Sequence, residues 1–339
     1  MKKNIAVVGC GHWGKNLVRN FYELGVLSSI CDPDHLIAST FAKKYEVKNN
    51  SYTEILDDPN IKGIVLAVPA QLHASMAVDA MNKSKHVFVE KPLAMNENEA
   101  KLMIAAAKKN NVQLMVGHLL QYHPIFKTIR KIVDSGDIGK LNYIYSNRLS
   151  FGKVRSEEDV IWSFAPHDIS MILSLIGKDP KSVSVKSSCI LQKKIADSAT
   201  IHLEFEAGLK SHISVSWLNP YKEQKLVVVG KSAMLVFDDT KPWSEKLAFH
   251  SYKVENSHDL PILKKSNEEF IKVIEKEPLR SECQHFVNVV EENGKYGKTR
   301  LITNSIGFRD KVVRKINNQT SKYRIVFIGG SYTEGFLGN

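Results

Sequence analysis

The sequence lacks any apolar run long enough to span a bilayer, and it has few cysteines. Of its 339 residues, 43% are hydrophobic and 24% are charged, as in ordinary globular proteins. The first apolar stretch stops at Gly9, too early for the core of a secretion signal. The cysteines lie far apart without metal-ligand spacing, at Cys10, Cys31, Cys189 and Cys283. These absences predict a cytoplasmic protein with reduced thiols, no membrane segment and no metal site.

The chain has few acidic residues relative to basic ones, and its formal net charge is +11. Basic proteins often bind nucleic acid, but here the lysines are spread along predicted helices and no nucleic-acid-binding module is recognisable. We therefore expect no nucleic-acid partner. The charge suits a solvated surface, or attraction of an anionic small substrate such as a nucleotide sugar.

Three glycines near the N-terminus have the spacing of a dinucleotide-binding turn. The apolar segment at residues 5–8 is followed by Gly9, Gly11 and Gly14, and a helix-length segment begins at Lys15. In the pattern G-x-G-x-x-G, the first glycine permits the tight turn. The second lets backbone N–H groups approach a pyrophosphate, and the third lets the helix pack closely on the strand.

An acidic residue completes this pattern. A second apolar strand ends at Asp32, which follows Gly14 by 18 residues, close to the roughly 20-residue spacing of a ribose-binding carboxylate. A carboxylate at this position repels a 2′-phosphate, so the sequence favours NAD(H) over NADP(H). We expect His12 and Trp13, within the glycine turn, to be further cofactor contacts.

The periodicity of the first 120 residues alternates between strand and helix. Further strands are predicted over residues 63–68, 86–90 and 112–117, with helices over residues 34–44, 69–83 and 96–110. This alternation predicts an α/β fold with a doubly wound parallel sheet, a Rossmann domain over residues 1–120.

The pattern changes after a crossover helix at residues 124–134. Successive strands follow between residues 141 and 237, with one helix over residues 162–176, and a last helix is predicted over residues 278–292. Consecutive strands predict a mostly antiparallel open sheet. We therefore expect a second, α/β domain over residues 121–293 that binds the substrate.

Two segments contain residues suited to proton transfer. Lys91, within Glu90-Lys91-Pro92, follows the strand at residues 86–90, where ligands bind in doubly wound sheets. A lysine near a nicotinamide can polarise or protonate a hydroxyl, although an ordinary surface lysine is the alternative. His167 can remove a proton at neutral pH, and a capping or packing histidine fits the sequence equally well.

Other polar residues could line a ligand cleft. His73 follows Pro69 in a loop expected to overhang the cofactor, and its alternative is a residue at a helix N-terminus. The candidates for substrate contacts are Tyr122, Asn147, Arg148, Asp168 and Trp217. Each of these side chains could equally serve packing. Asp168 adjoins His167, so on a helix the two side chains point about 100° apart.

Taken together, these motifs resemble the Gfo/Idh/MocA oxidoreductase family over about residues 3–292. The resemblance implies hydride transfer between a sugar or cyclitol hydroxyl carbon and NAD(P), with Lys91 and His167 as catalytic residues. It also implies a homodimer or homotetramer formed through the open sheet of the second domain. The implied cofactor contacts are Gly9, Gly11, Gly14, Asp32, Pro69, His73 and Glu90. One departure is Ser163, which stands where the family often has an acid four residues before the histidine.

Four stretches also resemble nucleotide-sugar 3-dehydrogenases that act on UDP-N-acetylglucosamine or its uronic acid. They are residues 117–124, 134–139, 162–170 and 215–218. This resemblance implies oxidation at C3 of the sugar. Inositol or free-sugar dehydrogenation, and a non-catalytic NAD-binding regulatory role, remain alternatives.

The residues from 294 onward do not fit this plan. Residues 323–335 resemble the opening of an SGNH-type hydrolase, with Ser331 after a strand-like run. Gly330 stands where such enzymes have Asp, and eight residues follow Ser331. We expect a truncated fusion or a sequence artefact rather than a second active site.

Overall fold

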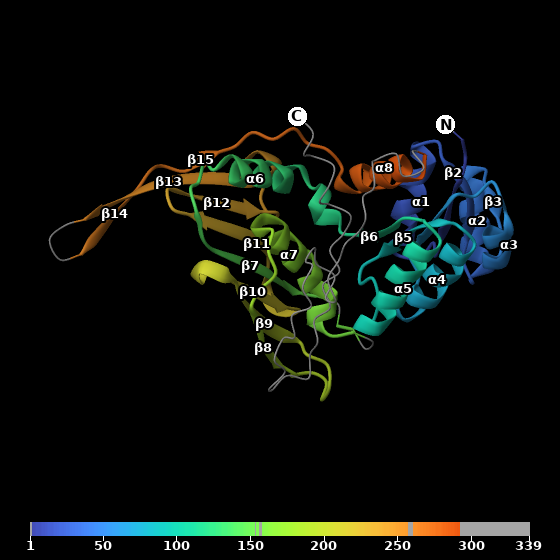
Figure 1. Cartoon of the computed structure of the whole chain (residues 1–339), viewed down its shortest axis with the longest axis horizontal. Helices are drawn as coiled ribbons and strands as arrows, with labels where there is room; N and C mark the ends of the chain where they lie inside the picture. The colour runs from blue at the N-terminus through green and yellow to red at the C-terminus, as the bar shows by residue number, and fades with distance from the viewer. Residues whose placement is uncertain (1, 153, 156–157, 257–259, 292–339) are drawn as a thin grey trace. The chain divides into compact units, whose positions relative to one another are not determined.

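The structure is a computed structural model that describes residues 2–152, 154–155, 158–256 and 260–291, and the chain forms two compact units (Figure 1). The first unit contains residues 2–119 and 277–291, and the second contains residues 120–276. The helix after residue 277 thus lies in the first unit, whereas the sequence division placed it with the second. The hydrolase-like tail lies outside the described residues. No helix within the described ranges is long and apolar enough to cross a membrane.

The first unit is built on a parallel six-stranded sheet with the order β3-β2-β1-β4-β5-β6. Its strands are β1 (Ile5–Val8), β2 (Leu27–Cys31), β3 (Lys48–Asn49), β4 (Gly63–Leu66), β5 (His86–Glu90) and β6 (Leu114–Gly117). Strand order reverses between β1 and β4, the point where doubly wound sheets bind nucleotides. The predicted α/β fold class is confirmed.

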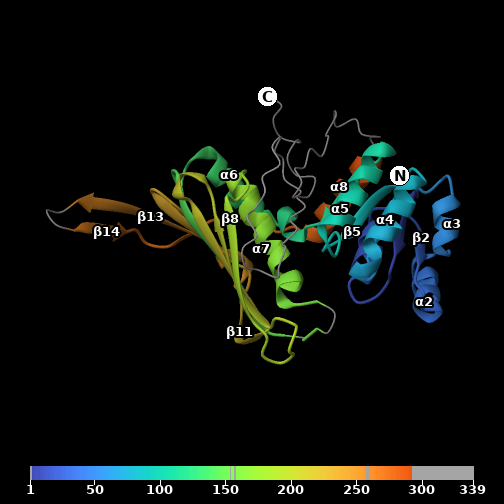
Figure 2. The same ribbon diagram turned by 60° about the horizontal axis from the view of Figure 1, so that its bottom comes forward.

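Helices cover both faces of this sheet, as its fully buried central strands require. They are α1 (Gly14–Glu23), α2 (His35–Tyr45), α3 (Tyr52–Asp57), α4 (His73–Asn82), α5 (Glu97–Lys109) and α8 (Pro278–Glu291). On one face, Met81 of α4 and Met103 of α5 join a core with Leu66 and Val89. Figure 2 shows α4 and α5 side by side.

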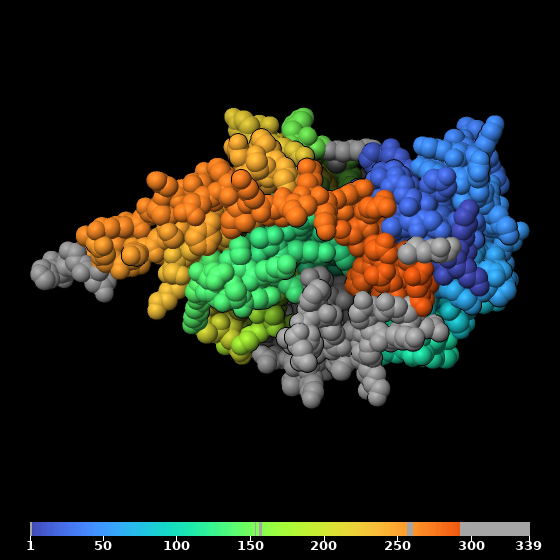
Figure 3. Space-filling view, turned by 90° about the horizontal axis from the view of Figure 1, so that it is seen from above, coloured from blue at the N-terminus to red at the C-terminus, as the bar shows by residue number. Residues whose placement is uncertain are grey.

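The opposite face of the sheet is covered in part by α8, the last described helix. The ring of Phe286 packs edge-on against Phe21 of α1 and Phe88 of β5, with ring centroids 6.2 Å and 5.7 Å apart. In Figure 3 the orange-red surface of α8 adjoins the blue surface of the N-terminal elements. The chain therefore returns to complete the core of the first unit.

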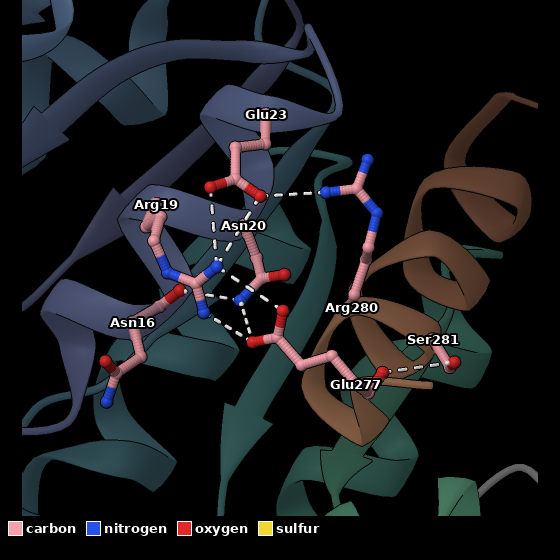
Figure 4. A network of polar contacts seen from close by, with 7 residues as sticks. All are labelled: Asn16, Arg19, Asn20, Glu23, Glu277, Arg280 and Ser281. Carbon is pink, nitrogen blue, oxygen red and sulfur yellow. Dashed lines mark hydrogen bonds and ion pairs between the residues drawn. The ribbon is translucent and has the colours of Figure 1, made fainter. Parts of the chain in front are cut away.

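Polar contacts also join α8 to α1 (Figure 4). Arg19 forms an ion pair with Glu277, which also accepts a hydrogen bond from Asn20 Nδ2 at 3.2 Å. Arg280 Nη1 lies 2.8 Å from Glu23 Oε2. Because these ion-pair side chains are exposed to solvent, they fix the alignment of the two helices more than they add stability.

The second unit is a nine-stranded sheet whose main path is β14-β13-β12-β11-β7-β10-β9-β8, with β15 on β13. Only the β7–β10 pair is parallel among its described strands, so the prediction of a mostly antiparallel sheet is confirmed. Its strands are β7 (Leu141–Phe151), β8 (Ser182–Ser188), β9 (Ser198–Glu204), β10 (Lys210–Ser216), β11 (Leu218–Gly230), β12 (Ala233–Asp238), β13 (Leu247–Asn256), β14 (Pro261–Lys265) and β15 (Glu269–Phe270).

Helices α6 (Pro124–Ser135) and α7 (Val160–Ile176) cover one face of this sheet. Ile144 and Ser146 of β7 point toward α7 and are fully buried. Alternate residues point to the other, open face, where Tyr143, Tyr145 and His212 stack with centroid separations of 5.5–6.5 Å. The β13–β14 hairpin projects from the sheet edge (Figures 1 and 2).

Candidate active site

The glycine turn has the geometry that a dinucleotide site needs. Gly9 has φ of +92°, and a Cβ there would lie 2.5 Å from the Ala67 carbonyl oxygen. A Cβ on Gly14 would lie 1.9 Å from the Gly9 carbonyl oxygen, so only glycine allows this close packing. A Cβ on Gly11 would face open space. The backbone at Gly11 is thus accessible, and α1 begins beside it without a side-chain cap, an arrangement that fits a pyrophosphate.

Asp32 is held at the end of β2 by two backbone contacts. The N–H of Cys10 donates to Asp32 Oδ2 at 2.7 Å, and the N–H of Asp34 donates to Oδ1 at 2.9 Å. Each carboxylate oxygen keeps a further lone pair, so the group fits the ribose hydroxyls of NAD. Burial, with the charge of Asp32, raises the pKa of the Cys10 thiol to about 12. Cys10 is therefore a neutral packing group.

Glu90 and Lys91 lie where β5 ends, and the Lys91–Pro92 peptide is cis. The Glu90 side chain is only 8% exposed. Its Oε1 accepts a hydrogen bond from the Trp13 indole at 2.6 Å, and its Oε2 accepts the backbone N–H of Lys91 at 3.3 Å. Burial raises the pKa of Glu90 to about 7, against the opposing effects of Trp13 and Lys91. The glycine turn and the lysine loop are thus joined through one carboxyl group.

Two loops of the first unit are joined by His73. Its Nδ1 lies 2.7 Å from the carbonyl oxygen of Pro92, and its Nε2 lies 2.9 Å from that of Val68. Burial lowers the pKa of the imidazole, and a neutral ring donates through one nitrogen. The sequence predicts His73 as a cofactor contact, but the structure places its ring inside the protein. Pro69 is exposed in the loop that His73 holds.

In the second unit, α7 carries His167 and Asp168 on different sides. Asp168 is 1% exposed and accepts hydrogen bonds from Arg148 Nε at 2.6 Å and Nη2 at 3.1 Å. Ser146 Oγ donates to the same carboxylate at 2.5 Å. His167 is half-buried, and Ser163 lies one helical turn before it. The predicted substrate residues Asp168 and Arg148 thus form an ion pair that joins α7 to β7.

The remaining predicted substrate residues have partners of their own within the protein. Asn147 lies on the open face of the sheet, where its Nδ2 donates to Glu223 at 2.9 Å. Trp217 is fully buried and donates its indole N–H to Asp197 at 2.6 Å. Tyr122 is also buried, with the Lys127 ammonium 5.3 Å from its ring centroid. Strand alternation alone could have assigned Asn147 to the opposite face.

Sequence patterns gave no sign of two buried acids, Asp197 and Glu282. Asp197 Oδ2 accepts the backbone N–H groups of Ile190 and Leu191 at 2.7 Å and 2.8 Å. Only long-range contacts identify such residues, because each acid stands alone in an otherwise ordinary segment. Within the described ranges, no group of three or more His, Cys, Asp or Glu side chains is arranged to hold a metal ion.

Two protein-family models match the chain. One is described as an oxidoreductase family with an NAD-binding Rossmann fold and matches residues 3–118. The other is the GFO/IDH/MocA C-terminal domain and matches residues 126–236. Together they cover more than half of the sequence, one on each side of the boundary between the two units.

Individual relatives are 21–27% identical to this chain over the residues that align. An uncharacterized oxidoreductase of Bacillus subtilis, YrbE, is 27% identical over 251 residues, which is 70% of this chain and 74% of that protein. The scyllo-inositol 2-dehydrogenase (NAD(+)) of Bacillus subtilis is 26% identical over 232 residues, 64% and 68% of the two chains. The solved UDP-N-acetylglucosamine 3-dehydrogenase GnnA of Acidithiobacillus ferrooxidans has a TM-score of 0.74 at 21% identity, over 85% of this chain and 88% of that one. The last comparison shows a shared fold.

Proposed function

Because the chain belongs to the Gfo/Idh/MocA oxidoreductase family and NAD is its cofactor, we propose that it transfers a hydride between a sugar hydroxyl carbon and nicotinamide. The glycine turn would hold the pyrophosphate, and Asp32 would bind the ribose. When bound, NAD accepts the hydride at C4 of its nicotinamide ring. The observation that supports the proposal most is the Trp13–Glu90 hydrogen bond of 2.6 Å, which fixes the loop of Lys91 to the cofactor-binding turn.

The protein's own groups would manage the hydroxyl proton. As the sugar carbon loses its hydride and becomes a carbonyl, the hydroxyl proton passes to Lys91 or to His167. Lys91 belongs to the first unit and His167 to the second. Ser163 carries no charge, and therefore we assign it no part in proton transfer.

We further propose C3 of a UDP-N-acetylhexosamine, or of its uronic acid, as the site of oxidation. The name and fold of the Acidithiobacillus relative support this substrate class, and the net charge of +11 favours an anionic substrate. A free cyclitol is the second candidate, supported by the match to scyllo-inositol 2-dehydrogenase.

The test is a substrate screen followed by NADH absorbance. UDP-N-acetylhexosamines, their uronic acids, free inositols and free sugars are supplied with NAD, for the wild type and for Lys91→Met. We expect turnover with a UDP-sugar, and a loss of about 10²–10⁴ in kcat for Lys91→Met with NAD binding retained. Full turnover by Lys91→Met would exclude Lys91 as the group that takes the hydroxyl proton. Tight NAD binding without turnover on any sugar would instead support a regulatory protein.

We also propose that the protein forms homodimers or homotetramers through the open face of the second sheet. Tyr143 is 41% exposed there and stacks with Tyr145 and His212, and exposed aromatic rings are typical of interface cores. Light scattering after gel filtration should show a smaller assembly for Tyr143→Glu. Leu36→Glu, on exposed α2 of the first unit, is the control. An unchanged mass for Tyr143→Glu would exclude this face.

A further inference from the structure

A second buried acid, Glu282 of α8, lies in the first unit and has no role in the reaction described above. Its side chain is 1% exposed, and its Oε1 has no hydrogen-bond partner within the part of the chain that the structure describes. An ionised carboxylate in such surroundings is strongly destabilised, so burial favours the protonated form.

The packing of α8 on β5 places Glu282 beside Glu90. Phe286 of α8 contacts Phe88 of β5, with centroids 5.7 Å apart. Glu90 lies two residues beyond Phe88 on the same face of the strand, about 6.6 Å along it. Glu282 lies four residues before Phe286 on the same face of the helix, about 6 Å along it. The two carboxyl groups are therefore displaced by similar distances from the same pair of rings.

The direction of α8 is fixed by a separate contact. A Cβ on Gly63, the first residue of β4, would lie 3.0 Å from Val290. The C-terminal half of α8 thus lies over the amino ends of the strands, and its N-terminal half, with Glu282, points toward their carboxyl ends. Consistent with this placement, burial and then the charge of Glu90 raise the pKa of Glu282 well above its usual range.

The other groups around this pair are few. From β6, Gly117 offers no side chain, and a Cβ there would lie 3.1 Å from the Glu90 carboxyl. Trp13 donates to Glu90, and Lys91 lowers the pKa of Glu90 by its positive charge. Cys283, next to Glu282, is kept neutral by burial, which raises its pKa. The charged groups farther along the α1–α8 interface are those of the two ion pairs, Arg19 with Glu277 and Arg280 with Glu23.

We propose that Glu282 is a positioning residue, whose protonated carboxyl donates to Glu90 and so sets the charge that Glu90 presents to Lys91. This inference rests on the proposed function, because it acts through the proposed catalytic lysine. The Trp13 indole and the Glu282 hydroxyl then both donate hydrogen bonds to the Glu90 carboxylate. These two bonds offset part of the cost of burying its charge. An ionised Glu90 favours the ammonium form of Lys91, and a neutral Glu90 favours the amine that can accept a proton.

Replacements of Glu282 in the full chain test this role. Glu282→Met keeps the side-chain volume but removes the donor, whereas Glu282→Gln keeps a donor without an acid. Without the donor at residue 282, the Glu90 carboxylate is less stable. In the kcat–pH profile of Glu282→Met, the limb that reports the ionisation of Glu90 should therefore move to higher pH by about one to two units. Glu282→Gln should keep the wild-type limb. Glu291→Gln, at the exposed end of α8, is the control for a change of charge on this helix.

A purely structural role predicts another outcome. If Glu282→Met and Glu282→Gln shift the profile equally, or if neither shifts it while both proteins melt as the wild type does, the inference is wrong. Because a buried acid is replaced by an apolar group, Glu282→Met should melt at or above the wild-type temperature.

A readout without turnover separates this inference from the proposed function. Infrared difference spectra during a pH titration detect the C=O stretch of a protonated carboxyl. We expect a band in the wild type that persists above the pH at which Glu90 ionises, about 7, and that is absent in Glu282→Gln. A band without activity on any sugar would refute the proposed function and keep the carboxyl pair. Activity without the band would refute the carboxyl pair and keep the function.

Discussion

Replacement of Asp168 by alanine would remove the anion from a buried ion pair. In the structure, the carboxylate accepts two hydrogen bonds from Arg148 and one from Ser146, and the Arg148 side chain is only 12% exposed. Asp168→Ala would leave the guanidinium buried without a counter-charge. Breaking one partner of such a pair costs about 3–5 kcal/mol, and we expect the second unit to lose that much unfolding free energy.

Urea unfolding followed by tryptophan fluorescence measures this loss, because three of the four tryptophans lie in the second unit, at Trp162, Trp217 and Trp243. The midpoint should fall by on the order of 1–2 M urea. The double variant Asp168→Leu with Arg148→Met should recover most of the loss, since apolar groups replace the pair. If Asp168→Ala unfolds at the wild-type midpoint but binds the sugar poorly, Asp168 is a substrate ligand and the reasoning from the ion pair fails.

Three further predictions concern the first unit. Asp32→Ala should weaken NAD binding by about 10–100-fold, through loss of charged hydrogen bonds to the ribose. It should also reduce the ratio of the dissociation constants for NADP and NAD. Calorimetric titration with both cofactors measures the two constants. Gly14→Ala should abolish NAD binding while the second unit still folds, because its Cβ would lie 1.9 Å from the Gly9 carbonyl oxygen. NADH fluorescence measures binding and circular dichroism measures folding, and NADH binding by this variant would contradict the prediction. Glu90 has a folded pKa of about 7 against a usual 4.5, so its stabilising effect is complete below pH 4.5 and is lost as pH rises to about 7. The loss is about 3 kcal/mol, and denaturation of Glu90→Gln across that range should lack this slope.

Much of the first unit could be predicted from the sequence because local patterns and the fold agree there. The strand over residues 86–90 has the predicted bounds. Fully buried parallel strands are continuous apolar runs, and their helices begin at good caps such as Ser51 and Asn96. The strands β13–β15 were missed, since they lie at a sheet edge where charged residues interrupt the alternation.

The sequence predicted individual residues of the candidate site better than it predicted their hydrogen-bond partners. Gly9 and Asp32 have local roles, and the structure gives both the expected geometry. Trp217 and Asp168 instead use their polar atoms on partners distant in sequence, Asp197 and Arg148. No local pattern reveals such pairs, because the sequence around a buried polar side chain is the same whether its partner is a ligand or another residue.

The return of α8 to the first unit has a consequence for the order of events during synthesis. The first 119 residues leave the ribosome without Phe286 and Val290, which fill the space beside Gly63. The whole second unit is translated before these residues, a delay on the order of 10–30 s at ordinary elongation rates. Until α8 is synthesised, the surfaces of Phe21 and Phe88 that pack against Phe286 stay uncovered in the nascent first unit. We expect a chaperone to bind the chain during that interval.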